Sequence, residues 1–287
     1  MVTFSSHAKW ILSGEHAVVR GGKAIAFPLR CYANSIAFEK GDNISITANS
    51  EYSPKTIFSL VEKACEFLDV PLKEISGYIS LKSSIPMKVG LGSSAAICVN
   101  IANLFGYYGF CEDILKLARY LEDKFHQKSS GLDVAVVLSD KPIIFSENKI
   151  IEFLKPSFWP PMILTYSGKK SVTSDCVNII KETFRKNEKL ALELDDQMNL
   201  SSNLCEDALK NSNFHKLRDG IRLGNEVFQR WGLCDSFLFF HMKKLLAAGA
   251  VAVKPIGSGL GGYILSLWED SPEKYGDIYL TLEKAWS

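Results

Sequence analysis

The stretch of this 287-residue chain best suited to chemistry is the loop PMKVGLGSSAA at residues 86–96. It follows an alternating stretch typical of a strand and precedes an apolar run typical of a buried helix. Glycines there let the backbone approach a ligand closely, and the free N–H groups at a helix N-terminus favour a phosphate. The hydroxyls of Ser93 and Ser94 add groups that bind phosphate or magnesium. The loop alone fits equally well a helix that a serine caps after a tight turn.

A second glycine-rich stretch, GSGLGG at 257–262, formally matches the dinucleotide fingerprint G-x-G-x-x-G. That fingerprint requires a helix after the glycines, whereas YILSLW at this place is typical of a strand. The preceding VAVK imitates the lysine strand of protein kinases, but H-R-D and D-F-G are absent. The phosphate loop G-x-x-x-x-G-K-[ST], G-x-S-x-G and H-E-x-x-H are also absent. These absences argue against P-loop nucleotidases, serine hydrolases and zinc proteases.

The first half of the chain must supply the elements that position the loop at 86–96. Apolar residues at helical spacing predict an amphipathic helix within 52–70, and a second one within 111–127 whose acidic first turn suits the helix dipole. In chain order we expect strands at 24–40 and 43–49, the helix within 52–70, a strand at 77–86, a buried helix from Ser94, the helix within 111–127, and a turn with an apolar segment at 129–138.

Three prolines within KPSFWPPM at 155–162 mark a boundary, because proline continues neither a helix nor a central strand. Beyond it we expect a strand at 162–168, several polar amphipathic helices, and a strand–glycine loop–strand unit at 250–268. The sequence therefore predicts an α+β protein of two domains, residues 1–155 and 156–287, with a cleft between them.

The composition of the chain argues against some classes of binding partner. A formal net charge of +1 and a pI near 7.6 argue against nucleic acid or an anionic membrane as an electrostatic partner. We see no secretory leader and no run of eighteen apolar residues, so we expect a cytoplasmic protein. The chain has seven cysteines and no C-x-x-C pair, which predicts reduced core residues rather than disulfides or a zinc site.

Three stretches in a fixed order make the chain resemble the GHMP kinase superfamily. They are KWILSGEHAVVRGGKAIAFPL near the start, PMKVGLGSSAA in the middle and KPIGSGLGGY near the end. Within the superfamily, GEHAVV and SSGLDVA are most similar to the mevalonate kinases. The resemblance implies an N-terminal domain like domain 2 of ribosomal protein S5 and a ferredoxin-like C-terminal domain. It also implies ATP and Mg²⁺ as cofactors and mevalonate as the alcohol substrate, in isoprenoid biosynthesis.

The resemblance also assigns the catalytic and cofactor-binding residues. It implies that Asp133 accepts the proton of the substrate hydroxyl and that Lys9 sits against this carboxylate. It implies magnesium ligands at Ser94 and at Glu122, which precedes Asp133 by eleven residues. Taken singly, these residues fit ordinary surface and turn positions. The nucleotide phosphates would be bound by Lys88, Val89, Gly90, Leu91, Gly92, Ser93, Ser94 and Ala95.

For the substrate, the resemblance implies binding by Glu15, His16, Thr173, Gly257 and Ser258. His126 also matches a family histidine, for which a structural role is expected. A homodimer is implied as well, and no pattern in the sequence adds support for it.

Three positions depart from the family pattern. Lys88 stands where a small residue is usual, Leu260 interrupts the glycine-rich stretch at 257–262, and Ser171 stands in place of an arginine. Lys169 or Lys170 could replace that arginine without its bidentate geometry. A phosphomevalonate or sugar kinase therefore stays an alternative, as does an inactive GHMP fold that only binds ligands.

Overall fold

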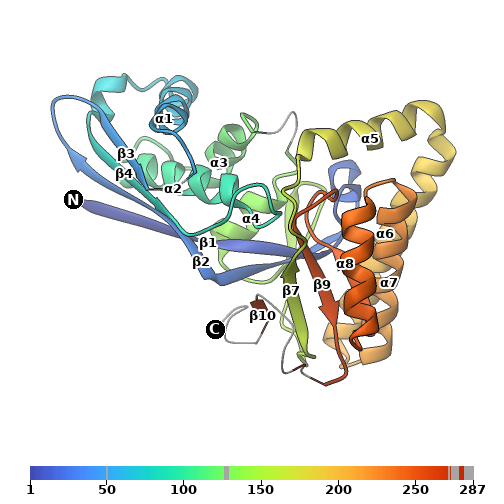
Figure 1. The fold of residues 1–287 in the computed structure, drawn as a ribbon. Helices are drawn as coiled ribbons and strands as arrows, with labels where there is room; N and C mark the ends of the chain where they lie inside the picture. The colour runs from blue at the N-terminus through green and yellow to red at the C-terminus, as the bar shows by residue number, and fades with distance from the viewer. Residues whose placement is uncertain (50, 126–128, 271, 273–277, 281–287) are drawn as a thin grey trace.

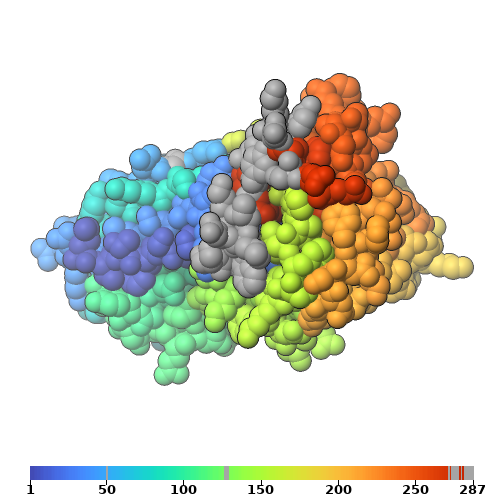
Figure 2. Space-filling view, turned by 90° about the horizontal axis from the view of Figure 1, so that it is seen from below, coloured from blue at the N-terminus to red at the C-terminus, as the bar shows by residue number. Residues whose placement is uncertain are grey.

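A computed structural model describes residues 1–49, 51–125, 129–270, 272 and 278–280 of the chain. Its strands form two separate sheets, each with its own helices (Figure 1). In the space-filling view of Figure 2, the blue-to-green first half and the orange-to-red second half lie at opposite ends of an elongated molecule. The predicted α+β class and the GHMP kinase fold are confirmed.

The first sheet has six strands in the order β3-β4-β2-β5-β6, with β1 paired to β2. All pairs are antiparallel except β3 with β4. The strands are β1 (Val2–Ser13), β2 (Ala24–Lys40), β3 (Ser45–Asn49), β4 (Gly77–Ser83), β5 (Ile143–Ser146) and β6 (Lys149–Phe153).

Four helices accompany this sheet: α1 (Pro54–Leu68), α2 (Ser93–Tyr107), α3 (Ile114–Glu122) and α4 (Leu132–Ser139). The helices predicted within 52–70 and 111–127 are confirmed as α1 and α3. The acidic first turn predicted for α3 is wrong in detail. Asp113 precedes this helix and caps it, its side chain accepting a hydrogen bond from the Lys116 N–H at 2.9 Å.

α2 is the buried helix of this half. It begins at Ser93, one residue earlier than expected, after Gly92 at φ 74°. Residues from Ala95 to Ala102 are all buried, so the helix lies in the core and holds the loop before it against the sheet. The apolar segment expected at 129–138 is the short helix α4, which begins after Gly131 at φ 80°.

The second sheet has the order β10-β7-β9-β8 and is antiparallel throughout. Its strands are β7 (Met162–Tyr166), β8 (Ala252–Pro255), β9 (Tyr263–Leu267) and β10 (Ile278–Leu280). The helices of this half are α5 (Thr173–Lys186), α6 (Glu188–Lys210), α7 (Phe214–Arg230) and α8 (Ser236–Ala247). The expected strand–glycine loop–strand unit is confirmed as β8, the loop and β9.

Alternating side chains place helices on both faces of the second sheet. Val253 and Ile264 pack with α8, whereas their neighbours Ala252 and Leu265 face α7. Successive residues of a strand point to opposite faces, so the two helices cover opposite sides. Lys254 follows Val253 and therefore points to the side of α7.

Two expectations from composition can be compared with the structure. All seven cysteines are free, and five are buried as expected. Cys31 is exposed and Cys234 half-buried, so a core position for these two was wrong. Among the described helices, none is long and apolar enough to cross a membrane.

Candidate active site

The loop at 86–96 joins β4 to α2 and is pressed against β1. The Lys9 N–H donates to the Leu91 carbonyl at 3.0 Å. Gly92 has no room for a side chain, because a Cβ there would lie 2.7 Å from Cγ of Lys9. Its φ of 74° is a second reason for glycine at this position, because other residues rarely adopt that conformation. Lys9 and the start of α2 are thus held together by the backbone.

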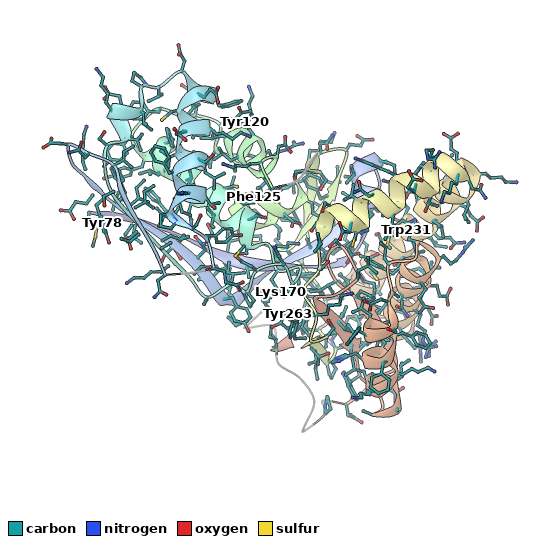
Figure 3. The ribbon with its side chains drawn as sticks, turned by 45° about the horizontal axis from the view of Figure 1, so that its top comes forward. Tyr78, Tyr120, Phe125, Lys170, Trp231 and Tyr263 are labelled. Atoms are coloured by element: carbon teal, nitrogen blue, oxygen red, sulfur yellow. The ribbon has the colours of Figure 1, made fainter. Side chains whose placement is uncertain are left out.

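The same loop contacts the second half of the chain. Ser171 N–H donates to the Lys88 carbonyl at 2.7 Å, and Tyr263 N–H donates to the Val89 carbonyl at 3.3 Å. A Cβ on Gly257 would lie 2.8 Å from Cα of Gly90, so these backbones touch. Figure 3 labels Lys170 and Tyr263 at this junction of the two halves. Three segments distant in sequence therefore meet at the start of α2.

The two serines at the N-terminus of α2 differ. Ser93 is buried, and its hydroxyl turns back to the Ile85 carbonyl at 3.5 Å. Ser94 is half-buried, and its hydroxyl has no hydrogen bond to another described residue. Ser94 is therefore the hydroxyl free to bind a ligand next to the helix N–H groups.

Lys9 and Asp133 form an ion pair beside this loop. Lys9 Nζ lies 2.8 Å from Oδ2 of Asp133. Lys9 belongs to β1 and its side chain is 2% exposed, whereas Asp133 lies in the first turn of α4 and is 28% exposed. The carboxylate thus has its cation on the buried side and an open side toward solvent. That arrangement can accept a proton from a bound hydroxyl.

Glu122, at the end of α3, is 1% exposed. Its Oε2 accepts a hydrogen bond from the Ser129 hydroxyl at 2.5 Å, but its buried Oε1 has no partner among the described residues. Burial raises the pKa of Glu122, nearby Asp133 raises it further, and Lys9 opposes both effects. A buried carboxylate with one oxygen unpaired is costly unless a cation binds it.

These residues fit a magnesium ion. Among the described residues no group of three or more His, Cys, Asp or Glu side chains could hold a metal by itself. Magnesium rarely needs such a cluster, because it keeps several waters and binds one or two carboxylates together with substrate phosphates. Glu122, with its unpaired oxygen, and the free hydroxyl of Ser94 are the donors available.

The turn after β1 brings Glu15 and His16 to the second half of the chain. Glu15 is buried and pairs with Lys254 of β8, with 2.5 Å between Oε1 and Nζ. His16 Nε2 lies 2.9 Å from the Ser258 carbonyl. The His16 ring packs edge-on against Trp231, and burial lowers the pKa of His16 to about 4. This histidine is therefore neutral at physiological pH.

Lys254 was missed from the sequence, where VAVK was set aside as an imitation of the protein-kinase strand. The available signal was a lysine in an otherwise apolar strand, since lysine is almost never fully buried unless it is paired.

The departures from the family pattern have structural explanations. Ser171 is buried, and its hydroxyl contacts the Ser258 hydroxyl at 2.7 Å and donates to the Gly259 carbonyl at 2.5 Å. It supports the glycine-rich loop at 257–262 instead of carrying charge. Leu260 packs with residues of α5 and α7, at φ 56°. Lys88 is exposed, at φ 62°.

The other residues expected at the site have the following positions. Thr173 is the first residue of α5 and is half-buried. Lys169 pairs with Asp235 and Lys170 pairs with Glu51, each at 2.5 Å. His126 lies outside the described residues.

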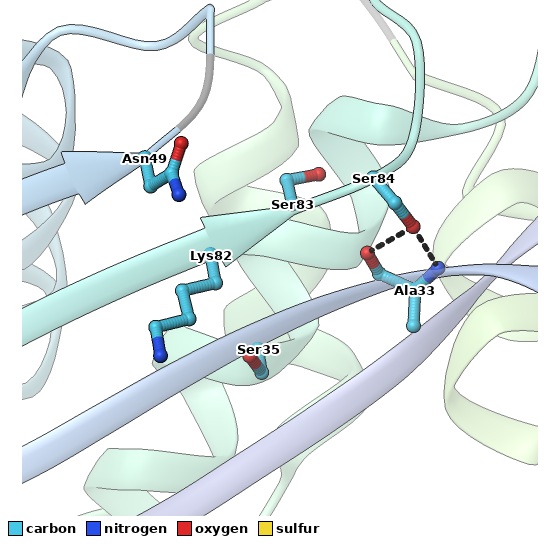
Figure 4. A pocket seen from close by; sticks show the side chains of 6 residues that line it. All are labelled: Ala33, Ser35, Asn49, Lys82, Ser83 and Ser84. Carbon is cyan, nitrogen blue, oxygen red and sulfur yellow. Dashed lines mark hydrogen bonds between the residues drawn. The ribbon is translucent and has the colours of Figure 1, made fainter.

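Two adjoining cavities open next to the start of the loop, and no sequence pattern indicated them. The larger, about 490 Å³, lies between the β3–α1 connection and the loop, with Tyr52 and Met87 in its wall. The other, about 310 Å³, includes Lys82 and Ser35 (Figure 4). Asn49 belongs to both.

Comparisons with known proteins find relatives of this chain among the GHMP kinases. Residues 56–141 match the GHMP kinases N terminal domain. A mevalonate kinase of Pyrococcus horikoshii is 28% identical over 300 residues, covering 93% of this chain and 88% of the relative. The crystal structure of Methanococcus jannaschii mevalonate kinase has a TM-score of 0.74 at 21% identity, covering 93% of this chain and 90% of that chain. Streptococcus pneumoniae phosphomevalonate kinase, solved with phosphomevalonate and AMPPNP, has a TM-score of 0.77 at 15% identity, with 94% and 93% covered.

Proposed function

We propose that this GHMP-fold chain is a kinase that transfers the γ-phosphoryl group of ATP to the primary hydroxyl of mevalonate, a step of isoprenoid biosynthesis. The observation that carries the proposal is the Lys9–Asp133 ion pair, 2.8 Å long, fixed beside the glycine loop at the N-terminus of α2. Phosphoryl transfer needs a phosphate cradle, charge neutralisation and a group that orients the attacking hydroxyl. The full-length similarity to archaeal mevalonate kinases supports this acceptor.

The loop holds the nucleotide phosphates. Backbone N–H groups of 88–95 and the dipole of α2 would stabilise the anion, and Ser94 and Glu122 would hold Mg²⁺. When bound, Mg–ATP supplies the transferable phosphoryl group and neutralises its charge. The cavity beside Tyr52 and Met87 is large enough for the nucleoside part of the nucleotide.

Charged side chains of this protein orient the hydroxyl of the acceptor and stabilise the transfer. Asp133 accepts the hydrogen bond of the substrate hydroxyl at its exposed side and takes the proton late in the transfer. Lys9 holds Asp133 in place and provides positive charge beside the migrating phosphoryl group. The substrate is also contacted by two residues of the turn after β1 and three of the second half. These are Glu15, His16, Thr173, Gly257 and Ser258.

These assignments place the acceptor between the predicted domains 1–155 and 156–287. The turn after β1 and the glycine loop after β8 meet there through His16 and Ser258. A homodimer and a cytoplasmic location stay predictions from the sequence.

A phosphomevalonate kinase is less well supported. It would need spare cations for the extra phosphate, and Lys169 and Lys170 both already have acidic partners. An inactive binding protein is also disfavoured, because Lys9 pairs with Asp133 and both residues lie close enough to Glu122 to affect its pKa.

The substrate assignment is tested by ADP release over mevalonate, phosphomevalonate, galactose and homoserine, each with Mg–ATP. We expect strong turnover with mevalonate and little with the others, because Lys169 and Lys170, the lysines considered for a second phosphate, already have acidic partners. Turnover with a sugar alone would rule out the mevalonate assignment, and turnover with phosphomevalonate alone would support the sister kinase.

Replacing the magnesium carboxylate should separate metal binding from stability. We expect Glu122→Gln to require a higher Mg²⁺ concentration for half-maximal activity, as should Ser94→Ala. In the absence of Mg²⁺ we expect the Glu122→Gln substitution to make the folded protein more stable than the wild type at high pH. The raised pKa of Glu122 makes the folded state bind a proton more tightly than the unfolded state. Wild-type stability therefore falls as pH rises from about 4.5 to about 8, and Glu122→Gln should lack this loss.

The checks are a magnesium titration of the rate and thermal unfolding in EDTA at pH 6 and pH 8. Glu182→Gln is the matched control, because Glu182 is an exposed glutamate of α5 whose one ion pair among the described residues is with Arg185. An unchanged magnesium titration in Glu122→Gln would contradict the ligand role.

A further inference from the structure

Lys254 and Glu15 form a fully buried ion pair, and the roles above give no purpose to Lys254. Lys254 Nζ donates to Oε1 of Glu15 at 2.5 Å and to the Pro255 carbonyl at 2.8 Å. The two side chains are 0% and 2% exposed. Buried ion pairs are often no more stabilising than apolar side chains of the same volume. A role in positioning therefore explains this pair better than a role in stability.

The surroundings leave the lysine little freedom. Gly224 of α7 makes room for its stem, since a Cβ there would lie 2.9 Å from Cδ of Lys254. The ammonium group lies 5.0 Å from the centre of the Phe228 ring, within cation–π range. Phe228 also contacts the His16 ring, with 6.0 Å between the ring centres. Glu15 is thus attached to a rigid group in the second half of the chain.

Only one oxygen of Glu15 is used by this pair. Oε2 is buried and has no hydrogen-bond partner among the described residues. On the other side, Lys9 is close enough to lower the pKa of Glu15, although burial raises it more. Charges therefore alternate from Lys254 through Glu15 and Lys9 to Asp133. The unpaired oxygen is an acceptor that lacks a donor, on a carboxylate that lies within electrostatic reach of Lys9, the partner of Asp133.

We infer that Lys254 is a positioning residue for the acceptor substrate, and that it fixes Glu15 so that Oε2 accepts a hydrogen bond from a hydroxyl of the bound alcohol. This inference rests on the proposed kinase function. It adds a residue of the second half to the determinants of acceptor specificity. The ligand chemistry is a polyol or hydroxy acid with a donor hydroxyl besides the one that is phosphorylated. Lys254 itself touches neither the nucleotide nor the reacting oxygen.

The test compares Lys254→Met, Glu15→Gln and the double variant, with KM for mevalonate, KM for ATP and kcat measured for each. Each single variant should raise the mevalonate KM roughly 10- to 100-fold, the range of coupling between contacting residues, with the ATP KM nearly unchanged. The double variant should be no worse than the worse single one, because both changes remove the same interaction. Multiplying effects, or an unchanged mevalonate KM, would overturn the inference.

Lys210→Met is the matched control. Lys210 also pairs with a glutamate of the first half, Glu152, at 2.7 Å, but it is 34% exposed. Its loss should leave the mevalonate KM unchanged. If Lys254→Met does not fold, the double variant replaces it in the comparison, because it has no unpaired buried charge. The double variant is then compared with Glu15→Gln alone. Equal mevalonate KM values then support the inference, and a higher value in the double variant overturns it.

The two proposals fail differently. If the wild type does not phosphorylate mevalonate, the proposed function is rejected, and the inference falls with it. If the wild type turns over and Lys254→Met keeps its mevalonate KM, only the inference about Lys254 is rejected.

Discussion

Asp133→Asn should lower kcat by about 10²- to 10⁴-fold, the usual contribution of a positioned acid–base group, while nucleotide affinity stays close to that of the wild type. Asparagine keeps the shape of the side chain, but its amide is no base and has no charge to pair with Lys9 at 2.8 Å. Asp133 lies in the first turn of α4 and is not among the residues 88–95 whose backbone groups would hold the phosphates. The loss should therefore appear in the chemical step.

The measurements are steady-state kcat with mevalonate and equilibrium binding of Mg–ADP. Asp140→Asn is a well-matched control, because Asp140 caps the other end of the same helix and pairs with His7 and Arg30 at 3.0 Å. Near-normal turnover of Asp133→Asn would show that this carboxylate is not essential. A matching loss in Asp140→Asn would point to damage of α4 instead.

Lys9→Met should lower kcat by about 10²- to 10³-fold, the size expected when one preorganised electrostatic group is lost. Methionine fills the space that the lysine stem occupies against Gly92, so the loop keeps its support. Because Lys9 opposes the rise in the pKa of Glu122, its loss should also raise the magnesium concentration needed for half-maximal activity. Neither effect is expected from a lysine that only neutralises a surface carboxylate.

This second prediction is checked by kcat and by a magnesium titration, with circular dichroism to confirm the fold. Lys216→Met is the control, since Lys216 pairs with Asp207 on an exposed surface of the second half. If Lys9→Met keeps more than about half of the wild-type kcat, a value within the range of ordinary surface substitutions, Lys9 has no part in the transfer.

The sequence alone was enough to identify the loop at 86–96 and the elements around it. This was possible because backbone turns depend on local residue types. Gly90 and Gly92 have φ values of 88° and 74°, which other residues rarely adopt. Ser53, with Pro54 after it, begins α1 by the same local logic. The resemblance of the three ordered stretches to the GHMP kinases then supplied the fold class.

Several features of the site depended on tertiary structure. Apart from Asp133 and Ser139 the α4 segment is apolar, and periodicity alone cannot distinguish such a segment from a buried strand. The distinction between Ser93 and Ser94 came from the direction in which each hydroxyl points.

The pairing of Glu15 with Lys254 shows the limit of sequence reasoning most clearly. Glu15 lies in the turn after β1 and Lys254 in β8 of the second sheet, and nothing in the local sequence of either specifies the other. Local residue types determine local backbone conformation, so the sequence indicated where a phosphate could bind. The strength of a charge–charge interaction depends on distance and burial, which only the packing of β1, α4 and β8 decides. Which carboxylate has a cation beside it, and which oxygen is left without a donor, could therefore be determined only from the folded chain.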